Sequence, residues 1–167
     1  VTGGADGNRD WVTLRNYRDD NGLNADINIR THDIATLGLW GPKAVNALGN
    51  FIDPNEIDIQ NFPFVTAKNL TLNLSGGKKV DVWAARISYV GESGWEIYFN
   101  NNKDDGLALY DSLLEVGVVP VGIETYANSR RLEKSFRLQG ADLETEYTAI
   151  EAAIQRPLVK EADFHGK

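Results

Sequence analysis

The sequence contains no cysteine and no methionine, and its two histidines are His32 and His165. Without cysteine the chain forms no disulfide and offers no thiolate as a metal ligand or nucleophile, and two histidines are too few for the usual structural zinc site. We therefore expect no metal site. Any chemistry should depend on carboxylates, tyrosines, arginines and backbone groups.

Long apolar runs and clustered positive charge are also missing. No stretch approaches the roughly 20 apolar residues of a membrane-spanning helix, and residues 1–7 lack the regions of a signal peptide. The net charge of −7 and the pI of about 4.8 disfavour nucleic acid, because neutralising phosphates requires a clustered basic face. We expect a cytoplasmic protein, or one of the mitochondrial matrix in a eukaryote, that binds neither nucleic acid nor a membrane. The missing initiator methionine favours a piece cut from a longer polypeptide.

The residues that are present suit a globular domain. With 42% hydrophobic and 25% charged residues among 167, the chain can bury a core. We expect residues 1–167 to form one domain, with a division into two lobes at about 1–66 and 67–167 as the alternative. The apolar spacing predicts helices at 10–18, 43–50, 104–116 and 124–138, strands at 25–30, 34–40, 68–74, 80–89 and 95–99, and a hairpin turn at 75–78. Antiparallel hairpins packed with helices predict an α+β fold.

One segment combines two carboxylates and two glycines in a short polar turn, Tyr89-Val90-Gly91-Glu92-Ser93-Gly94-Trp95-Glu96. Glycine permits positive φ and close backbone approach, and Trp95 should face the opposite side of its strand from Glu96. On the residues alone, a hairpin with solvated acids is the commoner arrangement, and Tyr89 would be a half-buried strand aromatic. Such a turn can also place an acid at the wall of a pocket.

A second block, residues 129–143, is a charged helix that runs into Gly140-Ala141-Asp142. Its spacing supports pairs one helical turn apart, such as Glu133 with Arg137. A solvated, salt-bridged helix face is the ordinary interpretation of this composition.

Together and in this order, the two blocks resemble the aminomethyltransferase (glycine cleavage T-protein) family, and most closely the folate-binding part of dimethylglycine and sarcosine dehydrogenases and oxidases. The resemblance extends over nearly the whole chain. Further similar segments are Leu39-Trp40-Gly41-Pro42-Lys43-Ala44, the corner Phe62-Pro63-Phe64, which we expect to be buried, and Ile150-Glu151-Ala152. Departures are Ala149, Ser135 and Gln139, where proline, glycine and tryptophan are usual, and they bear on helix packing and the pocket rim. Ala127 replaces an arginine that contacts folate in stand-alone T-proteins, which favours the dehydrogenase branch.

The resemblance implies a tetrahydrofolate site. Tyr89 and Glu96 match the tyrosine that opens the motif and the glutamate that closes it, and Glu96 would accept hydrogen bonds from the N–H and amino edge of the pterin. Glu92 matches an acidic position of the motif, and the backbone of Gly3 would line the folate. Arg131 matches the arginine of the family's Leu-Arg-Leu-Glu run, where we expect a structural ion pair and, as the lesser alternative, a ligand contact.

Two parts of the family pattern have no counterpart in this sequence. These are the aspartate motif that is thought to act in methylene transfer and the C-terminal barrel domain, expected after Phe164-His165-Gly166-Lys167. The resemblance therefore implies the central part of a folate-binding domain, with the catalytic aspartate outside this chain. We expect this fragment to be inactive alone and to act as part of a larger enzyme.

The implied function is one-carbon transfer from a methylated amine such as dimethylglycine or sarcosine. A fused flavin domain would oxidise the N-methyl group with FAD, and tetrahydrofolate would capture it as 5,10-methylenetetrahydrofolate. The chain itself has no Gly-x-Gly-x-x-Gly fingerprint for FAD. The alternatives are a stand-alone aminomethyltransferase or folate-dependent demethylase, a noncatalytic folate-binding protein, and a plain structural or interaction domain.

Overall fold

The structure, a computed structural model, describes residue 3 and residues 6–154. Its elements in chain order are α1 (Gly7–Asp20), β1 (Ile34–Trp40), α2 (Ala44–Leu48), α3 (Pro54–Ile57), β2 (Ala67–Asn73), the short 3₁₀ turn η1 (Ser75–Gly77), β3 (Lys79–Ala85), β4 (Gly94–Asn100), α4 (Lys103–Glu115), the π-helical turn η2 (Thr125–Arg130) and α5 (Arg131–Glu133).

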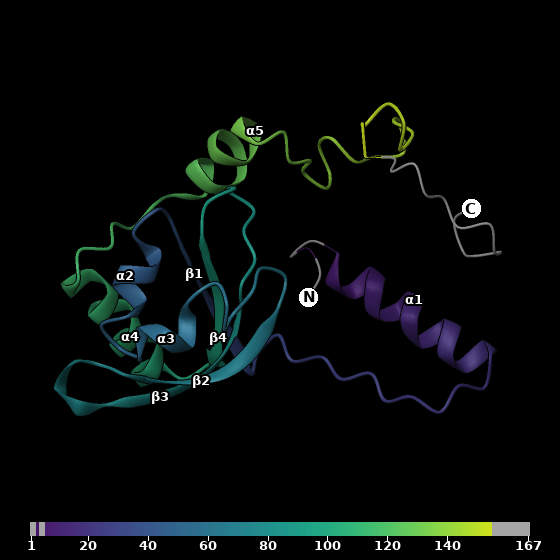
Figure 1. Cartoon of the computed structure of the whole chain (residues 1–167). Helices are drawn as coiled ribbons and strands as arrows, with labels where there is room; N and C mark the ends of the chain where they lie inside the picture. The colour runs from purple at the N-terminus through teal and green to yellow at the C-terminus, as the bar shows by residue number, and fades with distance from the viewer. Residues whose placement is uncertain (1–2, 4–5, 155–167) are drawn as a thin grey trace.

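The strands form one antiparallel sheet in the order β1-β4-β3-β2, and α2, α3 and α4 cover one of its faces (Figure 1). Alternate residues of each strand point into the core between the sheet and these helices, as the two-residue period of a strand requires. Along β4 the inward residues are Trp95, Ile97 and Phe99, all buried, and α4 contributes Leu109 and Leu113 to the same core. The opposite face of the sheet carries the other half of each strand and is not covered by these helices.

The α+β class and the antiparallel hairpins are confirmed. The β2–η1–β3 hairpin turns where the sequence predicts it, and Gly117, at φ +87°, follows the end of α4 as a glycine stop should. Asn102 caps the start of α4 by accepting a hydrogen bond from the Asp105 amide at 2.8 Å. The sheet also joins the two expected lobes, because β1 from residues 1–66 pairs with β4 from residues 67–167. The division into lobes stays a prediction.

Two expectations for the first half of the chain are wrong. Residues 25–30 are not a strand: they form part of an extended connection between α1 and β1, and Ile29 is 57% exposed. Alternation alone cannot make a strand without a neighbour to complete its hydrogen bonds. The corner at 62–64 is buried only in part, since Phe62 is 1% exposed and Phe64 is 57% exposed. Segment 53–66 also contains the short helix α3, which begins with Pro54 after the capping residue Asp53.

The helix predicted at 124–138 is shorter than expected. It ends at Glu133, and Ser135 then adopts φ +57°, which turns the chain in the left-handed sense. Arg137 is therefore not one helical turn beyond Glu133, and Glu133 pairs instead with Arg130 at 2.9 Å. Likewise the strand predicted at 80–89 ends at Ala85.

α1 has no buried residue and lies to one side of the sheet (Figure 1). None of the helices in the described part of the chain combines the length and apolar character needed to cross a membrane.

Candidate functional site

The loop that follows β3 is fixed to the body of the protein by a buried arginine. Arg86 is 5% exposed, and its Nη1 donates hydrogen bonds to the carbonyl oxygens of Ile57 and Asp58 at 3.0 Å and of Phe62 at 2.8 Å. A buried cation requires such partners. Residues 87–93 contact Trp40 at the end of β1, whose indole Nε1 donates to the carbonyl oxygen of Ile87 at 2.8 Å, and reach the helical turn of Arg130, which pairs with Glu92.

Glu96 lies on β4, on the face of the sheet opposite the core. Its register partners are Gly38 on β1 and Ala85 on β3, so small residues flank it on both sides. The space above Gly38 is filled by an aromatic ring, because a Cβ built at Gly38 would lie 2.1 Å from the indole of Trp40. Glu96 thus stands beside the Trp40 ring, and it is half-buried.

Aromatic rings continue from Trp40 to the polar loop. The Trp40 and Tyr126 rings stack with centroids 5.2 Å apart and planes 23° apart, and Tyr126 meets Tyr89 at 5.4 Å. Burial, followed by the charge of Glu96 and then Tyr89, raises the pKa of Tyr126. Tyr126 therefore connects the two motif residues that the resemblance singles out.

A second tyrosine contacts the carboxylate directly. Tyr98 follows Glu96 by two residues on the same face of β4, and its hydroxyl donates a hydrogen bond to Oε2 of Glu96. Its ring packs on Trp83 at 5.0 Å between centroids. Burial first, and the hydrogen bond to Glu96 next, raise the pKa of Tyr98, so the hydroxyl stays protonated as a donor at neutral pH.

These five half-buried side chains form one constellation, which we call the cradle: Trp40, Tyr89, Glu96, Tyr98 and Tyr126. A carboxylate beside aromatic rings suits a flat heteroaromatic ligand, because rings supply stacking surface and a carboxylate accepts hydrogen bonds from an N–H edge. The cradle brings together two of the predicted site residues, Tyr89 and Glu96.

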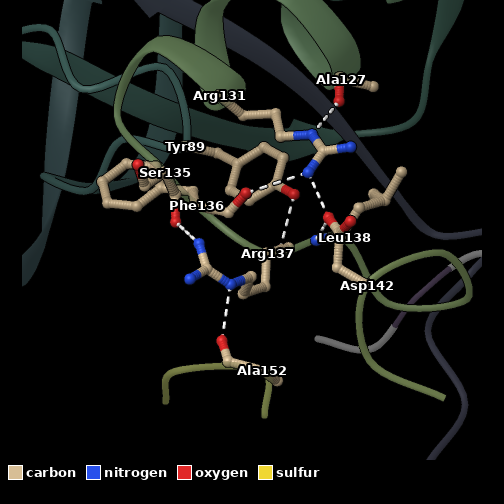
Figure 2. A network of polar contacts seen from close by, with 9 residues as sticks. All are labelled: Tyr89, Ala127, Arg131, Ser135, Phe136, Arg137, Leu138, Asp142 and Ala152. Atoms are coloured by element: carbon tan, nitrogen blue, oxygen red, sulfur yellow. Dashed lines mark hydrogen bonds and ion pairs between the residues drawn. The ribbon is translucent and has the colours of Figure 1, made fainter. Parts of the chain in front are cut away.

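The Tyr89 side of the cradle is held by a polar network (Figure 2). The Tyr89 hydroxyl donates to the carbonyl oxygen of Arg137 at 2.8 Å, and the ring stacks on Phe136 at 6.0 Å. Arg137 in turn donates from Nε to the carbonyl oxygen of Ala152 at 2.6 Å. The network therefore ties the loop to the chain beyond α5.

Arg131 lies at the centre of the same network (Figure 2). It is 5% exposed, donates to the carbonyl oxygens of Ala127 at 2.7 Å and Phe136 at 3.1 Å, and forms an ion pair with Asp142. The hydrogen bond from the Leu138 amide is the largest cause that lowers the pKa of Asp142; burial opposes it, and Arg131 adds to the lowering. The expected structural ion pair is present, and a ligand contact of Arg131 stays a prediction.

Glu92 faces the helical turns. Its carboxylate pairs with Arg130 at 2.7 Å, and its amide donates to the Ser88 hydroxyl at 3.1 Å. Gly91, at φ +71°, allows the loop to rest on the side chain of Lys134, which a Cβ would approach to 2.2 Å. Glu92 thus serves to dock the two motifs on each other.

Gly3 lies elsewhere in the described structure. It is exposed, and its carbonyl oxygen accepts a hydrogen bond from the Asp6 amide at 2.9 Å at the start of α1. No contact in the described part of the chain joins Gly3 to the cradle. Its role in lining a ligand stays a prediction.

Sequence reasoning missed Trp40, Tyr98 and Tyr126. Tyr98 had a usable signal, because residues two apart on a strand share a face. Trp40 and Tyr126 had none, since their places beside Glu96 depend on strand register and on helix docking.

A pocket of about 660 Å³ adjoins the cradle at Tyr98, and Trp83, which packs on the Tyr98 ring, lines this pocket as well. Among the described residues, no three histidine, cysteine, aspartate or glutamate side chains gather in a way that could hold a metal ion.

Comparison with known proteins shows the family of this chain. Residues 1–161 match the protein family described as the GCVT N-terminal domain. The chain belongs to that family. The aminomethyltransferase resemblance is therefore confirmed, and this GCVT domain has the antiparallel α+β sheet described above.

Two kinds of enzyme are among the relatives of this GCVT domain. Mitochondrial dimethylglycine dehydrogenase of Homo sapiens is 35% identical over 152 residues, which cover 87% of this chain and 16% of the human protein. An aminomethyltransferase of Staphylococcus carnosus is 30% identical over 168 residues, which cover 93% of this chain and 42% of the bacterial protein. The chain thus spans less than half the length of either relative.

Proposed function

We propose that this GCVT domain forms one wall of a tetrahydrofolate site in a larger enzyme that takes one-carbon units from methylated amines of the dimethylglycine or sarcosine type. The observation that carries the proposal is the cradle: residues far apart in the sequence present a carboxylate and aromatic rings at one place. The similarity to dimethylglycine dehydrogenases supports the choice of substrate class.

The cradle fits a reduced pterin. A pterin has a donor edge that matches the acceptor oxygens of Glu96. Its 2-amino group and the adjacent ring N–H form an edge that donates two parallel hydrogen bonds, and Glu96 offers two carboxylate oxygens. Trp40 and Tyr126 flank the carboxylate with apolar ring faces. When bound, tetrahydrofolate supplies the nitrogens that take up the one-carbon unit.

Under this proposal the chain contributes orientation and not acid–base chemistry. Glu96 holds the pterin edge, Tyr89 and Tyr126 limit its tilt, and the wider enzyme brings the reactive nitrogens to the carbon that they capture. Holding two reactants in register raises their effective concentration. A flavin, if the enzyme uses one, binds in another domain.

The test is calorimetric titration of 5-formyltetrahydrofolate, a stable analogue, into the full-length protein and its Glu96→Gln variant. We expect the substitution to weaken binding by about 1–3 kcal/mol, because a neutral amide accepts hydrogen bonds more weakly than a carboxylate and turns one donor toward the pterin donors. The matched control is Glu146→Gln, at an exposed carboxylate outside the cradle. Equal affinity of the wild type and Glu96→Gln would show that Glu96 does not contact the pterin.

A stand-alone aminomethyltransferase is the second candidate, supported by the identity to the staphylococcal enzymes. Both candidates need the same folate wall and differ in the one-carbon donor. The full-length protein would be assayed for methylenetetrahydrofolate formation with dimethylglycine or sarcosine, and separately with an aminomethylated lipoyl carrier. Turnover with the methylated amine supports the first proposal, and turnover with the carrier alone supports the second.

A further inference from the structure

The side chain of Glu96 has a partner that the family motif does not include. β4 runs between β1 and β3, so the Tyr98 backbone is paired on both sides, with Thr36 and with Trp83. The Tyr98 ring packs on the Trp83 ring with the planes 56° apart. A side chain held by strand pairing and by an aromatic neighbour has little freedom to move, which makes its hydroxyl a fixed donor.

The fixed donor points at the carboxylate. The Tyr98 hydroxyl bonds to Oε2 of Glu96, and an ionised carboxylate has about four lone-pair sites. One site is used by Tyr98, so both oxygens can still accept hydrogen bonds from a ligand. The tyrosine therefore orients the carboxylate and leaves acceptor sites free for a ligand.

Glu96 depends on this contact more than a surface glutamate would. Within the described residues it has no ion pair, and its strand neighbours Gly38 and Ala85 offer no polar side chain. Trp40 and Tyr126 restrict the space around it through their rings. The tyrosine hydroxyl is the one side-chain hydrogen bond that the described structure gives to Glu96.

We propose that Tyr98 is a positioning residue of the folate site, which sets the orientation of the Glu96 carboxylate before the ligand binds. This inference rests on the proposed function. Tyr98 acts through Glu96: its hydroxyl fixes the torsion of the carboxylate, so the two oxygens already face the donor edge of the pterin. A preoriented acceptor loses less rotational freedom on binding, and the gain appears as affinity.

The experiment is a double-mutant cycle on the affinity for 5-formyltetrahydrofolate, measured with the full-length protein. The variants are Tyr98→Phe, Glu96→Gln and the double substitution. Tyr98→Phe keeps the ring that packs on Trp83 and removes only the hydroxyl. We expect it to weaken binding about tenfold when Glu96 is present, as for loss of a hydrogen bond to a charged group. In the Glu96→Gln background the loss should shrink to about threefold or less, because hydrogen bonds to a neutral acceptor are about half as strong.

The coupling separates positioning from a purely structural role. If Tyr98 only supported the fold, its loss would weaken binding by the same factor in both backgrounds, and the inference would be overturned. No effect of Tyr98→Phe, while Glu96→Gln still weakens binding, would overturn the inference and leave the proposed function intact. No effect of Glu96→Gln would overturn both. Tyr110→Phe, at an exposed tyrosine of α4, is the matched control and should leave affinity unchanged.

Discussion

Two adjacent arginines offer a sharp test of how the two motifs are held together. Arg131 and Arg130 follow each other in the chain, yet their side chains are 6% and 36% exposed. Arg131 donates to two backbone carbonyls and pairs with Asp142, whereas Arg130 pairs with Glu92 and Glu133 at the surface. Replacing either by methionine keeps most of the apolar stem and removes the guanidinium.

The magnitude follows from the partners that are left behind. Arg131→Met removes the charged donor of the hydrogen bonds to the part-buried carbonyl oxygens of Ala127 and Phe136, and a hydrogen bond to a charged group contributes about 1.5–3 kcal/mol. We expect the free energy of unfolding to fall by about 3 kcal/mol, with the lost ion pair to Asp142 acting in the same direction. Arg130→Met should cost about 1 kcal/mol or less, because exposed ion pairs contribute little.

The assay is urea denaturation of the full-length protein and both variants, with the midpoint shifting and the slope unchanged if only stability differs. A loss for Arg130→Met as large as that for Arg131→Met would refute the reasoning from burial. Folate affinity measured on the folded variants gives a separate answer. Unchanged affinity for Arg131→Met would make the arginine purely structural, and a weakened affinity would show that it acts on the site, either by contacting the ligand or by holding the network around Tyr89.

Three further predictions follow from backbone geometry and ionisation. The folded-state pKa of Asp142 lies below its unfolded value, so its stabilisation is complete above about pH 4 and is lost as the pH falls through the folded value; acid unfolding followed by circular dichroism should be less pH-dependent in Asp142→Asn over that range. Ser135→Gly should raise the free energy of unfolding by about 0.5 kcal/mol, because glycine adopts the left-handed conformation without strain and this gain outweighs the added freedom of the unfolded chain. Ser129→Gly, inside η2, should lower it. The opposite order of the two variants in thermal melts would contradict the positive φ of Ser135. Gly94→Ala should lower the free energy of unfolding by about 3 kcal/mol, since its Cβ would lie 1.9 Å from a backbone oxygen. Gly117→Ala, at positive φ in open space, should lower it by about 1 kcal/mol. Equal losses of the two variants in denaturant titration would exclude the clash at Gly94.

The strands and α4 follow well from the sequence because their signals are local. β2 alternates apolar and polar residues, β1 and β4 are mostly apolar, and α4 has a capping asparagine before it and Gly117 after it. Burial of one face then selects the register. The failure at residues 25–30 shows the limit, since the same alternation there has no neighbouring strand to pair with.

The candidate site was predictable only at Tyr89 and Glu96, and through resemblance more than through physics. The residues alone favoured solvated acids in a turn, and one of the two acids, Glu92, does form a partly exposed ion pair with Arg130. Glu96 differs because it lies on a strand face, beside the Trp40 ring, which stacks on the Tyr126 ring. Turn composition carries no information about which side chains arrive from elsewhere.

The sequence by itself determined the class of fold, the family and the two motifs, because periodicity, glycine stops and motif order are properties of consecutive residues. Tertiary structure alone decided that Trp40, Glu96 and Tyr126 share one cradle and that Arg131 and not Arg130 is buried. The reason is physical: strand register and the docking of a helical turn set distances between residues far apart in the chain. Local pattern fixes which face of an element is apolar, and packing decides what that face meets.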